Sequence, residues 1–64
     1  MIRIVGRNRE TYPIQGQTTV GELASQLRIT ESAYITLKNG VPVTSDEPVS
    51  TEDDIVFMEV FSGG

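Results

Sequence analysis

The residues of this 64-residue chain that are best suited to chemistry are the last two, Gly63 and Gly64. Glycine has no Cβ, so a main chain that ends in two glycines can enter a narrow channel and present its carboxylate to a buried site on another protein. At the average glycine frequency of proteins, about 7% per position, two glycines end a chain by chance in roughly 0.5% of sequences. The alternative interpretation is an ordinary frayed terminus.

The rest of the chain offers little for catalysis. Cys and His are both absent, which removes the thiol nucleophile, the usual general base near neutral pH and the commonest transition-metal ligands. We therefore expect no enzyme activity, no metal and no cofactor. Nine acidic residues against five basic ones give a net charge of −4, which disfavours nucleic acid and anionic lipid as ligands and favours a partner with a basic face.

The length predicts a single small domain, which buries only about 60% of its unfolded surface. Its stability must come from apolar packing, because disulfides and zinc are not available to this composition. The longest apolar stretch is residues 55–58, far short of a membrane span. Met1 leads directly into strand-like sequence without a signal peptide. We expect a cytoplasmic monomer without a membrane partner.

Alternating apolar residues predict a hairpin from residues 2–5 and 11–15, with turn residues at 6–8 between them. Pro13 cannot donate a ladder hydrogen bond, so the second strand should be an edge strand. A helix should follow, because Thr19 and Glu22 have the spacing in which the hydroxyl and the carboxylate each bind a free backbone amide. The apolar residues of this helix share one face, which we expect to cover a sheet: Val20, Leu23, Ala24 and Leu27. The alternative for this stripe is a groove for a partner.

A second hairpin is predicted after the helix. In residues 34–38 we expect Ile35 and Leu37 to point inward, and Asn39-Gly40 favours a two-residue type I′ turn. We expect residues 41–43 to form a short peripheral strand and residues 55–60 to form the last strand. Residues 44–54 between them should cross the surface, with a short helical turn as an option.

This order of elements predicts an α+β protein with the β-grasp fold: a mixed sheet of four or five strands with one helix across one face. The first and last strands should pair in parallel at its centre, because the connection that contains the helix is long. We expect the folded domain to span residues 1–60 and a flexible tail to span residues 61–64.

Three segments resemble a known family. Residues 37–43 (LKNGVPV) are similar to its central hairpin, residues 52–55 (EDDI) to the acidic turn before its last strand, and residues 59–64 (EVFSGG) to its ending. The family contains the ubiquitin-like sulfur carriers of thiamine and molybdopterin synthesis and the small archaeal modifier proteins. The likeness covers the whole chain, and the ending is its most specific part.

The resemblance implies that an ATP-dependent E1-like enzyme adenylates the carboxylate of Gly64. A sulfur donor would then form a thiocarboxylate, which a sulfur-accepting synthase uses in cofactor or tRNA thiolation, or an amine of a target lysine would form an isopeptide bond. Ubiquitin has several lysines, whereas Lys38 is the only lysine here, so Lys38 and the terminal amine are the candidate acceptors within the chain. A dedicated modifier and a non-covalent binding module remain the alternatives.

Both sides of the last strand are apolar. Ile55 and Phe57 share one side, which we expect to meet core residues under the helix: Ile4, Leu23, Leu27 and Leu37. The other side should form an exposed patch that docks the activating enzyme together with Phe61: Val56, Met58 and Val60. The alternatives are a loop that covers this patch or the opposite orientation of the strand. The acidic run at residues 52–54 is either a steering surface for a basic partner or a solvated turn.

Overall fold

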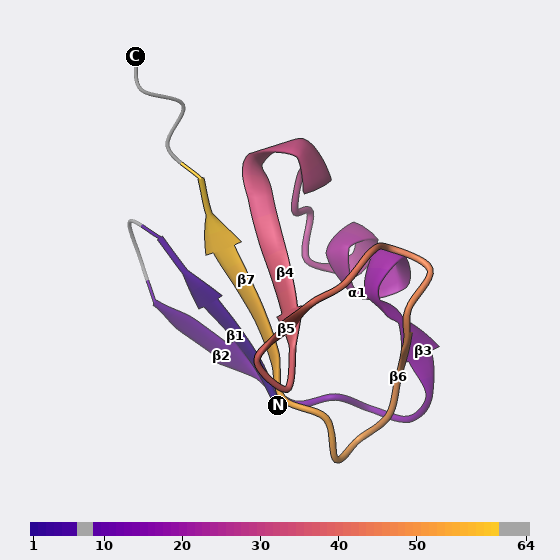
Figure 1. Ribbon diagram of the computed structural model, residues 1–64. Coiled ribbons are helices and arrows are strands. Elements are labelled where there is room, and N and C mark those ends of the chain that lie inside the picture. Colours follow the sequence, from indigo (N-terminus) through magenta and orange to yellow (C-terminus); the bar gives the residue numbers. More distant parts are fainter. Residues whose placement is uncertain (7–8, 61–64) are drawn as a thin grey trace.

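A five-stranded mixed sheet with one helix on one side forms the body of the protein (Figure 1). The computed structural model describes residues 1–6 and 9–60. Its elements, in chain order, are β1 (Ile2–Val5), β2 (Glu10–Tyr12), β3 (Thr18–Thr19), α1 (Val20–Gln26), the 3₁₀ helix η1 (Glu31–Ala33), β4 (Tyr34–Lys38), β5 (Val41–Pro42), β6 (Pro48–Val49) and β7 (Ile55–Glu59).

The strand order in the main sheet is β2-β1-β7-β4-β5, and β3 and β6 form a separate two-stranded sheet. The central pair, β1 and β7, is parallel, whereas β2, β4 and β5 add antiparallel neighbours. A parallel pair requires a long connection, and here the connection contains the helix. The predicted β-grasp fold, with its first and last strands paired at the centre, is confirmed.

The helix begins where the sequence predicts. The Thr19 hydroxyl accepts a hydrogen bond from the backbone N–H of Glu22 at 3.2 Å, a cap that typically contributes about 1 kcal/mol. The reciprocal half of the predicted box is wrong: the Glu22 carboxylate accepts from the hydroxyl of Thr18 at 2.7 Å. Three of the four apolar helix positions are buried, and the fourth packs at the edge of the core: Val20, Leu23, Ala24 and Leu27. The stripe therefore serves the core.

The Asn39-Gly40 turn joins β4 to β5 with φ values of 52° and 86°, as a type I′ turn requires. The Asn39 side chain also ties this turn to the start of β7. Its amide nitrogen donates to Asp53 Oδ1 at 3.1 Å, and its oxygen accepts from the N–H of Asp54 at 2.9 Å. Asparagine at this position thus supplies both the positive φ and two cross-links.

Several element boundaries differ from the predictions. The second strand covers Glu10–Tyr12 rather than residues 11–15, because Pro13 cannot donate a ladder hydrogen bond, and Ile14 is buried in the core. The predicted strands at 41–43 and 55–60 each end one residue earlier, and the expected turn at 6–8 lies partly outside the described residues.

The segment at residues 44–54 is more than a surface crossing. It contains β6, which pairs with β3, and it buries Val49 to 2% exposure in the core. Backbone N–H groups at the start of α1 hold the segment as well: Val20 donates to Glu47 O at 3.0 Å and Gly21 to Ser45 O at 2.7 Å. Residues 44–54, all of them described, contain no helical turn, which was the option considered there; the 3₁₀ helix η1 lies earlier in the chain, before β4. We call residues 44–54 the crossing segment.

Candidate functional site

The register of the sheet divides its side chains between two faces, since paired residues on neighbouring strands point to the same side. In β7, Ile55 and Phe57 are 0% and 1% exposed and belong to the core, whereas Met58 is 41% exposed. We call these sides the inner face and the outer face. The expected orientation of β7 agrees with this arrangement.

The expected orientation of β4 is wrong. Ile35 pairs with Met58, and Leu37 pairs with Val56. Both Ile35 and Leu37 therefore lie on the outer face, and Ile35 is 47% exposed. The inner side of β4 instead carries Tyr34, Thr36 and Lys38. The alternation of β4 was read correctly, but its more polar side faces inward.

Pairing with β1 extends the outer face further, because Val5 lies opposite Met58. Val60 follows β7 and is 45% exposed. Its N–H donates to Ala33 O at 2.8 Å, which holds this end of the chain beside η1. We define the outer apolar patch as the side chains that share this face: Val5, Ile35, Leu37, Val56, Met58 and Val60.

The two covering elements of the fold pack against the inner face. Residues of α1 and of β6 belong to the same buried cluster as Ile55 and Phe57, and Figure 1 shows the helix and the β3–β6 pair on the same side of the main sheet. The outer apolar patch thus lies on the opposite side from α1, at the end of the strand that leads toward residue 61.

Charges on the outer face lie at the other end of β7. Arg3 pairs with Val56 in the register, and its guanidinium contacts Asp54 at 2.5 Å. Both side chains are about half exposed, and exposed pairs of this kind contribute at most about 1 kcal/mol. The outer apolar patch is therefore uncharged near Val60 and is bordered by the Arg3–Asp54 ion pair at its other end.

The acidic run at residues 52–54 is largely committed to contacts within the chain. Asp53 accepts from the N–H of Ser50 at 2.8 Å, from its hydroxyl at 3.2 Å and from Asn39. The Ser50 amide, the Asn39 amide and, more weakly, the nearby ammonium of Lys38 hold the pKa of Asp53 below its usual value. Asp54 contacts Arg3 and is partly exposed, and Glu52 is the most exposed member of the run.

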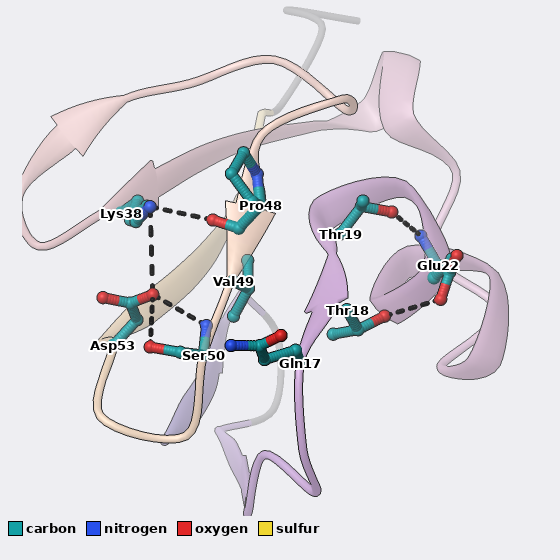
Figure 2. Close-up of a pocket in the computed structure, with 9 residues that line it drawn as sticks. All are labelled: Gln17, Thr18, Thr19, Glu22, Lys38, Pro48, Val49, Ser50 and Asp53. Carbon is teal, nitrogen blue, oxygen red and sulfur yellow. Dashed lines mark hydrogen bonds and ion pairs between the residues drawn. The ribbon is translucent and has the colours of Figure 1, made fainter.

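Lys38, the candidate acceptor lysine, lies beneath the crossing segment (Figure 2). Its Nζ donates to the carbonyl oxygen of Pro48 at 2.8 Å and to Glu47 Oε2 at 3.1 Å, and Asp53 Oδ2 lies 3.8 Å away. The side chain is 21% exposed. Figure 2 shows it on one wall of a pocket whose other wall is formed by the residues around the helix cap.

Three of the predicted site residues lie outside the described residues: Phe61, Gly63 and Gly64. Of the others, Val56, Met58 and Val60 share the outer face as expected, and Lys38 lies on the inner face. Sequence reasoning missed Ile35, Leu37 and Val5 as neighbours of this patch. The sequence held no local signal for the orientation of β4, since Tyr34, Thr36 and Lys38 can form a boundary under a loop as well as a solvent face.

A mixed sheet in the order 2-1-7-4-5 with one helix across its inner face defines a β-grasp protein of the ubiquitin-like class. The sequence matches the family of small archaeal modifier protein 2 over residues 1–61, and the chain belongs to that family. No curated protein sequence matches the chain. Membership in a ubiquitin-like modifier family implies E1-like enzymes and target proteins as partners in general. None of the helices in the described ranges, 1–6 and 9–60, is long and apolar enough to cross a bilayer.

Proposed function

We propose that this protein is a ubiquitin-like modifier that works through the carboxylate of Gly64, which a separate E1-like enzyme activates with ATP. Membership in the small archaeal modifier protein 2 family is the observation that carries this proposal. We further propose that the protein acts in the cytoplasm, where ATP is supplied, as a folded domain of residues 1–60 with residues 61–64 as its tail.

The activation converts a poor electrophile into a reactive acyl group. A carboxylate oxygen of Gly64 attacks the α-phosphorus of ATP, and pyrophosphate leaves. The nitrogen of a target lysine then attacks the acyl carbon and loses a proton, AMP leaves, and an isopeptide bond forms. A partner cysteine can first displace AMP and pass the acyl group on as a thioester. The modifier contributes no catalytic side chain to these steps.

The tail matches the geometric demands of this chemistry. Four extended residues, 61–64, span at most about 14 Å, which lets the carboxylate reach a buried nucleotide while the folded body stays outside. Gly63 and Gly64 have no Cβ to obstruct a narrow channel. The end of β7 at Glu59, with Val60 held against Ala33, supports a fixed starting point for that reach.

The outer apolar patch is the surface that we assign to the activating enzyme, with Phe61 at its margin. Its support is the exposure of three large side chains on one face, Ile35, Met58 and Val60. Single exposed apolar residues are common, whereas contiguous ones mark binding surfaces. Met58 suits such a surface because a flexible thioether adapts to the shape of a partner.

A role as a sulfur carrier shares the same adenylate and is our second candidate. Hydrosulfide attacks the acyl carbon, AMP leaves, and Gly64 ends as a thiocarboxylate that a synthase can use. The observation that favours it is the resemblance of residues 37–43 and 59–64 to sulfur carriers. A protein without Cys could carry sulfur in this way, because the sulfur would be on the main-chain carboxyl group.

Mass spectrometry of protein purified from its native cell separates these functions. Conjugates digested with chymotrypsin, which cleaves after Phe61, should carry Ser62-Gly63-Gly64 on target lysines. A thiocarboxylate should appear as the mass gain of replacing one oxygen by sulfur. If neither species forms, both candidates fail and a non-covalent binding module remains.

Deletion of Gly64 provides the matched control for that experiment. Both covalent products should disappear, while the melting temperature should stay within the small range typical of terminal changes. A large fall in the melting temperature would mean that the terminus belongs to the fold, which would contradict its role as a projecting acyl group.

A further inference from the structure

We propose that Lys38 is a structural lysine that is withheld from conjugation, so that the acceptor lysines for this modifier lie on other proteins and the modifier does not build chains through its own lysine. The inference rests on the proposed function, because protection from conjugation matters only for a modifier. Its evidence is the set of contacts that Lys38 makes on the inner face of the sheet. Because Lys38 is the only lysine of the sequence, protection of this one side chain decides whether lysine-linked chains can form.

The register places Lys38 on the covered side of the sheet. Its Cα pairs with that of Ile55, which is fully buried. At this end of the sheet, the cover over the inner face is the crossing segment, which supplies Glu47, Pro48 and Asp53 around the ammonium group. The Lys38 side chain is 21% exposed, compared with 50% for Arg3 on the outer face.

Three oxygen atoms of the crossing segment surround Nζ of Lys38. Pro48 O lies at 2.8 Å, Glu47 Oε2 at 3.1 Å and Asp53 Oδ2 at 3.8 Å. The carbonyl of Pro48 belongs to β6, which pairs with β3 and continues into the buried Val49. Withdrawal of Lys38 would leave this carbonyl and two carboxylates without their common cation.

The chemistry of acyl transfer requires the opposite arrangement. Nζ must lose a proton and direct its lone pair at an acyl carbon about 3–3.5 Å away, with AMP or a thiolate as the leaving group. Any lysine ammonium must lose a proton to gain that lone pair, and at Lys38 the nitrogen must also give up its bonds to Pro48 and Glu47. For Lys38 to react, it must leave these partners.

The crossing segment, which supplies these partners, is itself held by hydrogen bonds. Its residues Ser45 and Glu47 accept hydrogen bonds from the first two residues of α1, and Asp53 is held by Ser50 and Asn39. Opening the segment would therefore disturb the β3–β6 pair and the helix start together. Local openings of this kind occur at a free-energy cost, which lowers the rate at which a protected group reacts.

Acetylation by N-hydroxysuccinimidyl acetate tests this protection without any enzyme. The matched control is Arg9→Lys, which keeps the charge and introduces a lysine at an exposed position. Rates are measured by peptide mapping in the folded protein and normalised to the rates in urea. Lys38 should react at least about tenfold more slowly than the introduced lysine. Equal normalised rates would overturn the proposal.

Conjugation in the native host tests its consequence. Conjugates of the wild-type protein and of the Arg9→Lys variant are digested with chymotrypsin and searched for lysines that carry Ser62-Gly63-Gly64. Chymotrypsin is needed because trypsin, with no basic residue after Lys38, would leave residues 39–64 attached. The remnant should appear on other proteins and on the introduced lysine and should be absent from Lys38.

The two arms keep this inference separate from the proposed function. A remnant on Lys38 as frequent as on the introduced lysine would overturn the inference and leave the modifier function intact. Failure to find any conjugate would count against the modifier function, and the acetylation rates would still decide whether Lys38 is protected.

Discussion

The two faces of β7 differ in environment although they are equally apolar. The inner face buries Ile55 and Phe57 almost completely under α1 and the crossing segment. The outer face presents Met58 at 41% exposure beside Ile35 at 47%. Within residues 1–6 and 9–60, α1 is the one α-helix that covers the sheet, and the short chain leaves little material for a second layer.

This difference separates stability from recognition within a single strand. Side chains on the inner face exclude water within the folded chain, so their apolar area contributes directly to the free energy of unfolding. Side chains on the outer face gain little from folding and much from association, because a partner can remove the remaining exposed area from water. Neighbouring residues of β7 should therefore respond to substitution in opposite ways.

The largest expected effect comes from Phe57→Ala. Removal of a fully buried aromatic ring costs about 3–5 kcal/mol, which is comparable with the roughly 3–10 kcal/mol expected for a domain of this length. We expect extensive unfolding at room temperature, measured by circular dichroism in urea. Met58→Ala is the control and should change stability by only about 0.5 kcal/mol. Similar losses for both variants would contradict the division between the faces.

The second effect is the reverse case, in which binding changes and stability does not. Met58→Asp places a charge in the outer apolar patch, and we expect at least about a tenfold loss of affinity for the E1-like enzyme, because burial of an unpaired charge opposes docking. Isothermal titration calorimetry measures the affinity and thermal unfolding the stability. Gln15→Asp, which adds the same charge at an exposed position away from the patch, is the control. Unchanged affinity for Met58→Asp would remove the patch from the proposed docking surface.

Much of the fold was predictable because its signals are local. The Thr19 cap, the Asn39-Gly40 turn and the apolar helix stripe each depend on a few neighbouring residues, and the length of the helical connection then required a parallel central pair. The orientation of β7 followed from its strongest apolar residues, Ile55 and Phe57. These features are set by backbone geometry and side-chain periodicity, which a sequence displays directly.

The orientation of β4 and the burial of Val49 were not predictable in the same way. Both depend on the crossing segment, which covers the inner face where α1 does not reach and brings its own polar partners to Lys38. Ile35 and Leu37 are consequently on the outer face, although they are the more apolar side of β4. A non-local contact decided the face, and only the pairing register reveals it.

The smallest effect concerns how acid weakens the cover over the inner face. The hydrogen bonds from Ser50 and Asn39 lower the pKa of Asp53 in the folded state, so its contribution to stability is complete above the unfolded value of about 3.9 and is lost as the pH falls through the lower folded value. Asp53→Asn should therefore make the fall in stability below about pH 4 shallower in urea titrations, compared with the exposed control Glu52→Gln. Part of the slope should remain, because the Thr44 hydroxyl lowers the pKa of Asp46 as well. An unchanged slope for Asp53→Asn would mean that these hydrogen bonds do not couple the crossing segment to the fold, and that the inner face keeps its cover without them.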